Sequence, residues 1–152
     1  MSPGRISSKV VTDRFSWIEE MIGGIRSLPL ESKEDFLSDR RNIWAAESCL
    51  RRALEALLDL GRHILAKGFG QGVSEYKEIA TKLGENGVLL GEEVKLLRIL
   101  AGYRNRLVHF YHEVTPEELY EICAYRLGDL ERMKKAYLRW LREHEEMLNE
   151  EL

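Results

Sequence analysis

Cysteine is scarce in this sequence, and long apolar runs are missing. The two cysteines, Cys49 and Cys123, lie far apart with no metal-ligand spacing around them, so we expect two buried, reduced thiols and no metal centre. No apolar run approaches the roughly 20 residues that a membrane span requires, and no signal peptide opens the chain. We therefore expect a cytoplasmic protein without a membrane partner.

Alternating apolar and polar runs bounded by turn residues are missing too, so the sequence predicts no convincing β-strand. Helical periodicity dominates instead. A chain of 152 residues suits one domain and can bury a core without disulfides or metals, and its 44% hydrophobic and 32% charged residues exclude wholesale disorder. We expect residues 1–152 to form a single all-α domain with a disordered start at residues 1–4.

An excess of positive charge is also absent. The 23 Lys and Arg residues are outnumbered by 26 Asp and Glu residues, which gives a net charge of −3. Phosphate neutralisation comes from nearby Lys and Arg side chains, so this balance excludes a general nucleic-acid coat. Any binding to RNA would need a local basic patch.

Apolar periodicity and start and stop signals predict five helical segments. Pro29 ends the first segment, and Ser32 can cap a short turn before the second. The Gly-rich run at 68–72 is a plain connector, because no strand precedes it as a phosphate cradle would require. The five predicted helices cover residues 6–28, 38–67, 74–83, 92–111 and 115–149.

Two of these helices have explicit start signals. Ser74 can cap one, and Thr115, Pro116 and Glu118 supply an N-cap, a proline at the first helical position and a capping box for the other. Residues 131–152 form the charged C-terminal end of the last helix, which we expect to be a solvated face, with a partner contact as the alternative. Short connections predict a four- to five-helix up-and-down bundle.

The segment at 96–113 carries the chemically informative residues. Placed on a helix, it shows two neighbouring apolar stripes that look like core, with Arg104 in the second. Gly102 on the remaining face costs about 1 kcal/mol of helix propensity relative to alanine, which close approach of another chain or a ligand would explain. The residues that share this face are Arg98, Gly102, Asn105, His109 and His112.

Arg104 and His109 would lie about 140° apart on a straight helix. They can converge if the arginine reaches around, if the helix bends or ends near His109, or if two chains meet there. We favour two chains, because a two-fold axis would bring two copies of the set into one cleft. The simpler alternative is that both side chains bind carbonyls or a carboxylate near the end of the helix.

The run from Arg104 to Tyr111, RNRLVHFY, resembles the RNxxxHxY form of the R-x4-6-H motif of the HEPN superfamily, with the tyrosine that HepT-like proteins carry. A bare R-x4-H is common by chance, whereas the extended motif in an all-helical chain is more specific. The resemblance covers roughly residues 36–130. It includes the family's long second helix, through Asp39, Arg40, Leu50, Glu55, Asp59 and Gly61, and the start of the last helix at 114–120.

This resemblance implies a HEPN-type homodimer whose paired motifs line an interfacial cleft and cleave RNA, without a metal or other cofactor, by attack of the ribose 2′-hydroxyl on the adjacent phosphate. Histidine can act as acid or base near neutrality, and arginine is a permanent cation that matches phosphate oxygens. His109 and Arg104 are therefore the expected catalytic residues. Asn105 would orient His109 or the RNA. Further phosphate contacts would come from Arg106, Arg98 and His112, for which a solvated surface is the alternative.

Tyr111 has two interpretations. Its spacing suits a core or interface aromatic, and the resemblance implies the tyrosine that an MntA-type minimal nucleotidyltransferase antitoxin modifies with AMP to silence a ribonuclease toxin. Added phosphate charge beside an RNA cleft would repel the substrate. Two alternatives stay open: a non-catalytic nucleotide-binding or regulatory subunit of a nucleotidyltransferase complex, and a purely structural helical dimer. Assemblies larger than a dimer also stay open.

Overall fold

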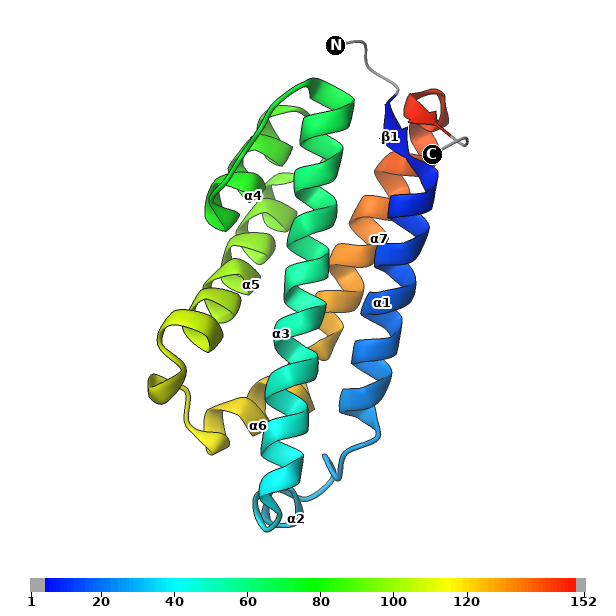
Figure 1. Cartoon of the computed structure of the whole chain (residues 1–152). Helices are drawn as coiled ribbons and strands as arrows, with labels where there is room; N and C mark the ends of the chain where they lie inside the picture. Colours follow the sequence, from blue (N-terminus) through cyan, green and yellow to red (C-terminus); the bar gives the residue numbers. More distant parts are fainter. Residues whose placement is uncertain (1–4, 150–152) are drawn as a thin grey trace.

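The structure is a computed structural model that describes residues 5–149, apart from the side chain of Tyr111. The predicted disordered start at 1–4 and the end at 150–152 lie outside the described residues. Four long helices run along one axis in alternating directions, as an up-and-down bundle requires (Figure 1). They are α1 (Ser8–Arg26), α3 (Arg40–His63), α5 (Gly91–His109) and α7 (Leu127–Glu143).

Three shorter helices bring the number within residues 5–149 to seven. α2 (Lys33–Leu37) and α6 (Pro116–Tyr125) close one end of the bundle, and α4 (Tyr76–Glu85) packs beside α5 (Figure 1). Ser32 caps α2 as predicted, since its hydroxyl accepts the Asp35 N–H at 3.2 Å. Three non-α turns complete the helical segments: a π-type turn at Ile64–Gly68, and 3₁₀ turns at Tyr111–Glu113 and Glu145–Met147.

A two-stranded parallel pair ties the two ends of the described chain together. β1 (Ile6–Ser7) pairs with β2 (Leu148–Asn149), with Ile6 opposite Leu148 and Ser7 opposite Asn149. The expectation of no strand is wrong here, because two residues are too few to show the alternation by which a strand is recognised. The all-α class holds for the rest of the described residues.

The last predicted helix, 115–149, is also corrected. Arg126, with φ −119° and ψ 4°, lies between α6 and α7, and α7 ends at Glu143. The charged end is not simply a solvated face, because one side of α7 is buried in the core. That side consists of Leu127, Leu130, Met133, Lys134, Ala136, Tyr137, Trp140 and Leu141.

The predicted caps are confirmed in part. The Thr115 hydroxyl accepts the Glu118 N–H at 3.1 Å, as an N-cap does. The Glu118 carboxylate, however, pairs with Arg106 rather than completing a capping box. The predicted Ser74 cap is wrong, because α4 begins at Tyr76 and its N-cap residue is Glu75.

α3 is the central helix, and the core gathers around its apolar face. Its Leu57 carbonyl accepts the buried Tyr137 hydroxyl of α7 at 2.9 Å. This close approach needs a glycine at position 61, where a Cβ atom would lie 2.7 Å from the Tyr137 oxygen. The buried α3 residues are Ala46, Leu50, Ala53, Leu54, Ala56, Leu57, Leu58, Leu60 and Gly61.

Both cysteines are free thiols. Cys123 is buried as expected, and burial raises its pKa to about 12. Cys49 is only partly buried, and burial raises its pKa less. None of the helices within residues 5–149 combines the length and apolarity needed to cross a membrane.

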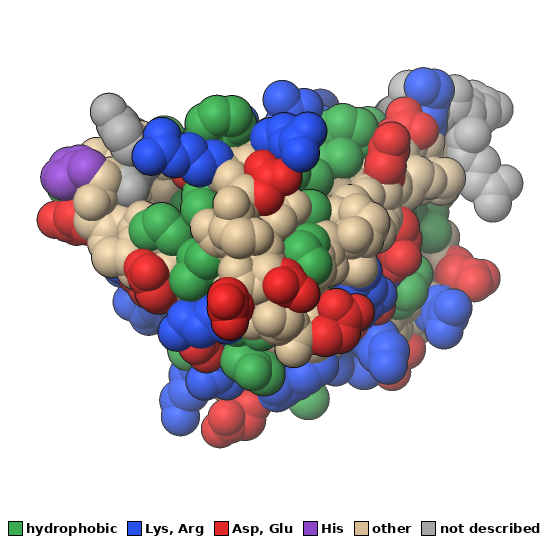
Figure 2. All heavy atoms as spheres, turned by 90° about the horizontal axis from the view of Figure 1, so that it is seen from below, with side chains coloured by type: hydrophobic (Ala, Val, Ile, Leu, Met, Phe, Trp, Pro, Cys, Tyr) green, Lys and Arg blue, Asp and Glu red, His purple; other side chains and the backbone are tan. Residues whose placement is uncertain are grey.

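The end of the bundle that carries α2 and α6 mixes charges of both signs. Figure 2 shows acidic and basic side chains interspersed on this face, with hydrophobic side chains exposed between them. Such a face offers no uniform field for a polyanion, so a basic patch for RNA has to be sought elsewhere on the molecule.

His63, the last residue of α3, holds β1 in place. Its Nε2 atom accepts the Ser7 N–H at 3.0 Å, which requires the unprotonated ring nitrogen. Burial, with smaller contributions from Lys67 and Arg14, lowers the pKa of His63 below its ordinary 6.5. Protonation therefore opposes the folded state.

We predict that His63 makes the protein less stable in mild acid. The unfolded chain takes up a proton on this histidine at a higher pH than the folded chain does, so the free energy of unfolding falls as the pH drops below about 6.5. A His63→Gln variant keeps an acceptor and does not titrate, so its stability should fall less. Urea unfolding of both proteins between about pH 7.5 and 5 measures this. Parallel pH profiles would contradict the prediction.

Candidate functional site

A cavity of about 530 Å³ lies where the end of α5 meets the start of α4 and the last turns of α3. Three of the predicted site residues line it together: Arg104, Asn105 and His109. The rest of the lining consists of Arg62, Ser74, Glu75, Tyr76, Lys77 and Phe110.

Arg104 and His109 reach this cavity within a single chain because α5 ends at His109. The next residue, Phe110, has φ −132° and ψ 39°, so the helix does not continue past the histidine. The predicted helix to 111 is thus two residues too long. The end of the helix thus lets both side chains line one cavity within a single chain. The two-chain arrangement favoured from the sequence stays a prediction.

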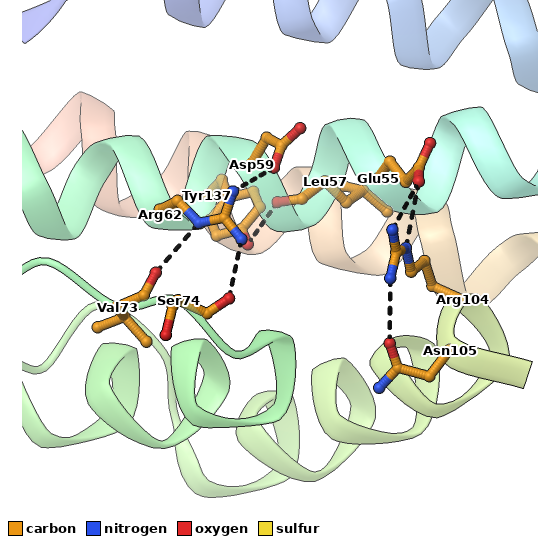
Figure 3. A network of polar contacts seen from close by, with 9 residues as sticks. All are labelled: Glu55, Leu57, Asp59, Arg62, Val73, Ser74, Arg104, Asn105 and Tyr137. Carbon is orange, nitrogen blue, oxygen red and sulfur yellow. Dashed lines mark hydrogen bonds and ion pairs between the residues drawn. The ribbon is translucent and has the colours of Figure 1, made fainter. Parts of the chain in front are cut away.

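Arg104 is held by three residues instead of packing in an apolar stripe, and Figure 3 shows two of them, Glu55 and Asn105. Its Nε and Nη2 atoms donate to Glu55 Oε2 at 3.2 and 3.0 Å, and Nη1 donates to Asn105 Oδ1 at 3.3 Å. The guanidinium carbon also lies 4.5 Å from the centre of the Tyr76 ring, in cation–π range. The side chain is 17% exposed, so it is fixed in place and still reaches the cavity.

Arg62 of α3 braces the opposite wall (Figure 3). It donates to the carbonyls of Val73 and Ser74 at 3.1 and 3.2 Å and pairs with Asp59 at 3.1 Å. Its guanidinium lies 4.9 Å from the centre of the Tyr76 ring. These contacts anchor the connection that leads into α4, and so they position Ser74 to Lys77 along the cavity.

Two carboxylates pair with the arginines of the cavity: Glu55 with Arg104, and Asp59 with Arg62. Glu55 also pairs with Arg51 at 3.0 Å. Burial raises the pKa of Asp59, while Arg62 and Arg14 act in the opposite direction.

Lys77, by contrast, has no hydrogen bond or ion pair within the described residues, so its charge is available to a ligand in the cavity.

Three other predicted site residues, Arg98, Arg106 and His112, are not among the residues that line this cavity. Arg98 donates to Thr81 Oγ1 at 3.4 Å. Arg106 makes a bidentate pair with Glu118 at 2.6 and 2.7 Å, which lowers the pKa of that carboxyl. His112 is exposed in the turn after α5. The side chain of Tyr111 lies outside the described residues.

Gly102 is not explained by packing inside the chain. A Cβ atom there would lie 3.9 Å from Lys77 Cε, which is an ordinary contact. The close approach inferred from the sequence therefore remains a prediction about a second chain or a ligand.

Sequence reasoning missed the cavity's contributors from α3 and α4. Arg62 and Tyr76 carry no local motif, and their role comes from the Tyr76 ring, which contacts both Arg62 and Arg104. Lys77 could only have been found by knowing that α4 starts beside α5. One weak signal was present, since Glu55, Asp59 and Arg62 lie at helical spacing on one face of α3.

A comparison with known protein families shows which family the chain belongs to. Residues 18–137 match the model of the ribonuclease HepT-like family, which is most of the chain. The chain belongs to this family. The predicted resemblance to HepT-like HEPN proteins is confirmed, and so is the enzyme class, ribonuclease, at the level of the family.

One protein that is similar in sequence and two that are similar in fold complete the comparison. The chain is 26% identical over 123 residues to the tRNA nuclease HepT of Aphanizomenon flos-aquae, covering 80% of this chain and 83% of that protein. Its fold is similar to that of the AMPylated HEPN toxin of Shewanella oneidensis, solved in complex with its MNT antitoxin. The TM-score is 0.76 at 20% identity, covering 86% of this chain and 97% of the other.

A third relative is YutE of Bacillus subtilis, described as a cytosolic protein of unknown function. The TM-score is 0.70 at 22% identity, covering 88% of this HepT-like chain and 89% of YutE.

Among the described residues, no group of three or more His, Cys, Asp and Glu side chains is placed to hold a metal ion.

We predict that the Glu55 carboxylate contributes more to stability than the more exposed Glu118 carboxylate. Glu55 receives charged hydrogen bonds from Arg104, whose side chain is largely buried, so Glu55→Ala should cost about 1.5–3 kcal/mol. Glu118→Ala breaks a half-exposed pair and should cost at most about 1 kcal/mol. Urea unfolding of both variants measures the difference. Equal losses would show that Glu55 does not anchor Arg104.

Proposed function

We propose that this chain is the ribonuclease toxin of a toxin–antitoxin pair, and that it cleaves RNA without a metal ion at the cavity beside α5. The observation that carries the proposal is that Arg104, Asn105 and His109 line one cavity together with the cations of Arg62 and Lys77. The overall charge is negative, so RNA binding needs cations gathered at one place. This cavity gathers three of them, although Arg104 and Arg62 are also paired with Glu55 and Asp59. The names of the relatives, a tRNA nuclease and an antitoxin-bound toxin, support the same assignment.

The proposed reaction is an internal transesterification. The ribose 2′-oxygen attacks the adjacent phosphorus, the new O2′–P bond forms and the P–O5′ bond breaks, which leaves a 2′,3′-cyclic phosphate and a 5′-hydroxyl. One group must take the proton from the 2′-hydroxyl, and another must give a proton to the departing 5′-oxygen. His109 is the histidine that lines the cavity, and we assign one of these roles to it.

A homodimer would supply the second proton-transfer group. Each chain places one histidine in its cavity, whereas the reaction needs both a base and an acid. A two-fold axis near α5 would bring two copies of His109 to one phosphate. Gly102, which lacks a packing role within the chain, would allow the second helix to come close.

Arg104 would stabilise the charge that builds up on the phosphate. Its guanidinium is held by Glu55 and Tyr76 before any substrate arrives, so little reorganisation is needed in the transition state. Asn105, bonded to Arg104 at 3.3 Å, would orient the RNA or His109. Arg98, Arg106 and His112 would touch only RNA that extends beyond the cavity.

The direct test is RNA cleavage in the presence of EDTA. Wild-type protein should cleave a labelled RNA, and His109→Ala should lower the rate by about 10²- to 10⁴-fold, the usual range for a lost acid–base group. His144→Ala is the matched control, because His144 stacks on Trp140 away from the cavity and should leave the rate unchanged.

Cleavage that stops when EDTA is added would rule out the metal-independent reaction, and equal cleavage by His109→Ala would rule out the assigned residue. Tight binding of a mononucleotide with no RNA turnover would favour the alternative, a regulatory subunit of a nucleotidyltransferase complex.

The partner we propose is a cognate minimal nucleotidyltransferase antitoxin that attaches AMP to Tyr111. The support is the structural neighbour, an AMPylated HEPN toxin bound to an MNT antitoxin, and the position of Tyr111 directly after Phe110, a cavity residue. AMP adds bulk and negative charge, which would neutralise nearby cations and repel RNA.

Modification of Tyr111 is testable by intact mass. Incubation with the cognate nucleotidyltransferase and ATP should add the mass of one or more AMP units and abolish RNA cleavage. Tyr111→Phe should gain no mass and stay active, whereas Tyr125→Phe, which removes a tyrosine that is 68% exposed, should be modified like the wild type. Equal modification of the Tyr111→Phe protein would place the acceptor elsewhere.

A further inference from the structure

Phe110 is a large hydrophobic side chain at the edge of the cavity, next to His109. It lines the cavity and is 48% exposed. Its ring meets the His109 ring edge-on, with the centroids 6.4 Å apart and the planes at 70°. A half-exposed aromatic ring beside a candidate acid–base group is available for stacking with a planar ligand.

The backbone holds Phe110 firmly in this position. Its N–H donates to the Arg106 carbonyl at 3.0 Å, and its own carbonyl accepts the Glu113 N–H at 2.8 Å. The residue is therefore fixed from both sides at the point where α5 ends. These bonds fix the backbone from which the ring projects, so that no loop has to be ordered when a base stacks on it, which reduces the entropy cost of binding.

Tyr76, which also lines the cavity, is already engaged. The Tyr76 ring contacts the guanidinium groups of both Arg62 and Arg104, at 4.9 and 4.5 Å. Tyr76 thus acts as a brace for the two arginines. Among the phenyl and phenol rings that the structure describes in the cavity, Phe110 remains for a substrate base.

Lys77 lies in the same cavity and has no ionic partner within the described residues. Its Cε atom is close to Gly102, 3.9 Å from where a Cβ atom would be, so its aliphatic stem lies along α5. A cavity of about 530 Å³ is within the range of pockets that hold small ligands, which leaves room for one nucleotide.

We propose that Phe110 stacks on an unpaired base next to the scissile phosphate, while Lys77 binds a phosphate of the same strand. This rests on the proposed ribonuclease function and defines its substrate class as single-stranded RNA. A base can stack on a side chain only when it is not paired within a helix, and a phenyl ring reads no hydrogen bonds, so the subsite tolerates any base.

A double-mutant cycle between the protein and the RNA tests the stacking. The probe is a short 2′-O-methyl RNA, which cannot be cleaved, with an abasic site on the 5′ or the 3′ side of the central phosphate. Wild-type protein should bind one of these abasic RNAs about 5- to 150-fold more weakly than the intact RNA, the range for loss of one stacked base. Phe110→Ala should bind the intact RNA equally weakly and no longer discriminate between the two. Phe110→Trp should discriminate as the wild type does.

Three controls make the outcome decisive. Trp44→Ala removes an aromatic residue that is 63% exposed and lies outside the cavity, and it should leave binding unchanged. Lys77→Ala should reduce the slope of log affinity against log salt by about 0.7, the value for one phosphate contact on a single strand. Annealing the probe to a complementary strand should weaken binding to wild-type protein at least as much as the abasic site does.

Additive effects of Phe110→Ala and the abasic site would overturn the stacking proposal, as would tight binding of the duplex. A change in oligomeric state of Phe110→Ala, measured by light scattering, would show instead that Phe110 belongs to an interface. Because the probe is not cleaved, these results do not depend on turnover. An inactive wild-type protein that still shows the cycle would contradict the ribonuclease function and leave the stacking site in place.

Discussion

The ion pair between Glu55 of α3 and Arg104 of α5 links two helices that are far apart in the sequence, and the candidate site is built around it. An arginine on a free helix surface would sample many rotamers. Here two hydrogen bonds to Glu55, one to Asn105 and the Tyr76 ring fix the guanidinium at the cavity wall. The same side chain that ties α5 to α3 is therefore oriented for a phosphate.

The remaining parts of the site follow from where helices begin and end. α5 stops at His109, which places the histidine at a helix terminus beside the cavity. α4 begins at Tyr76, and Arg62 fixes that start by binding the carbonyls of Val73 and Ser74. Each helix contributes side chains to the cavity. The π-type turn and the Gly-rich connection join the end of α3 to the start of α4.

The sequence predicted well what depends on neighbours along the chain. Helical periodicity located the long helices, and Thr115 and Ser32 are N-caps because each needs only a donor three residues away. The motif residues Arg104, Asn105 and His109 are close neighbours along the chain, and they line one cavity; their role in catalysis stays a prediction. The prediction failed where distant residues compete: Glu118 was expected to complete a cap, but Arg106 of α5 takes its carboxylate.

The contact that anchors Arg104 was not foreseen, because it joins residues far apart along the chain. Glu55 and Arg104 are 49 positions apart, and no local pattern could pair them. The charged C-terminal segment was predicted to face solvent because many of its residues are charged. Tyr137 and Trp140 of the same helix are nevertheless buried in the core. Even the short β1–β2 pair needs both ends of the chain before it can be recognised.

The central claim is that Arg104 and His109 act together on one phosphodiester. A crystal structure of the protein with a 2′-O-methyl RNA oligonucleotide, which cannot be cleaved, tests this most directly. We expect the phosphate next to the modified ribose within hydrogen-bond distance of both the Arg104 guanidinium and a His109 ring nitrogen, from one subunit or from two. RNA bound at another surface, with both side chains away from any phosphate, would contradict the account.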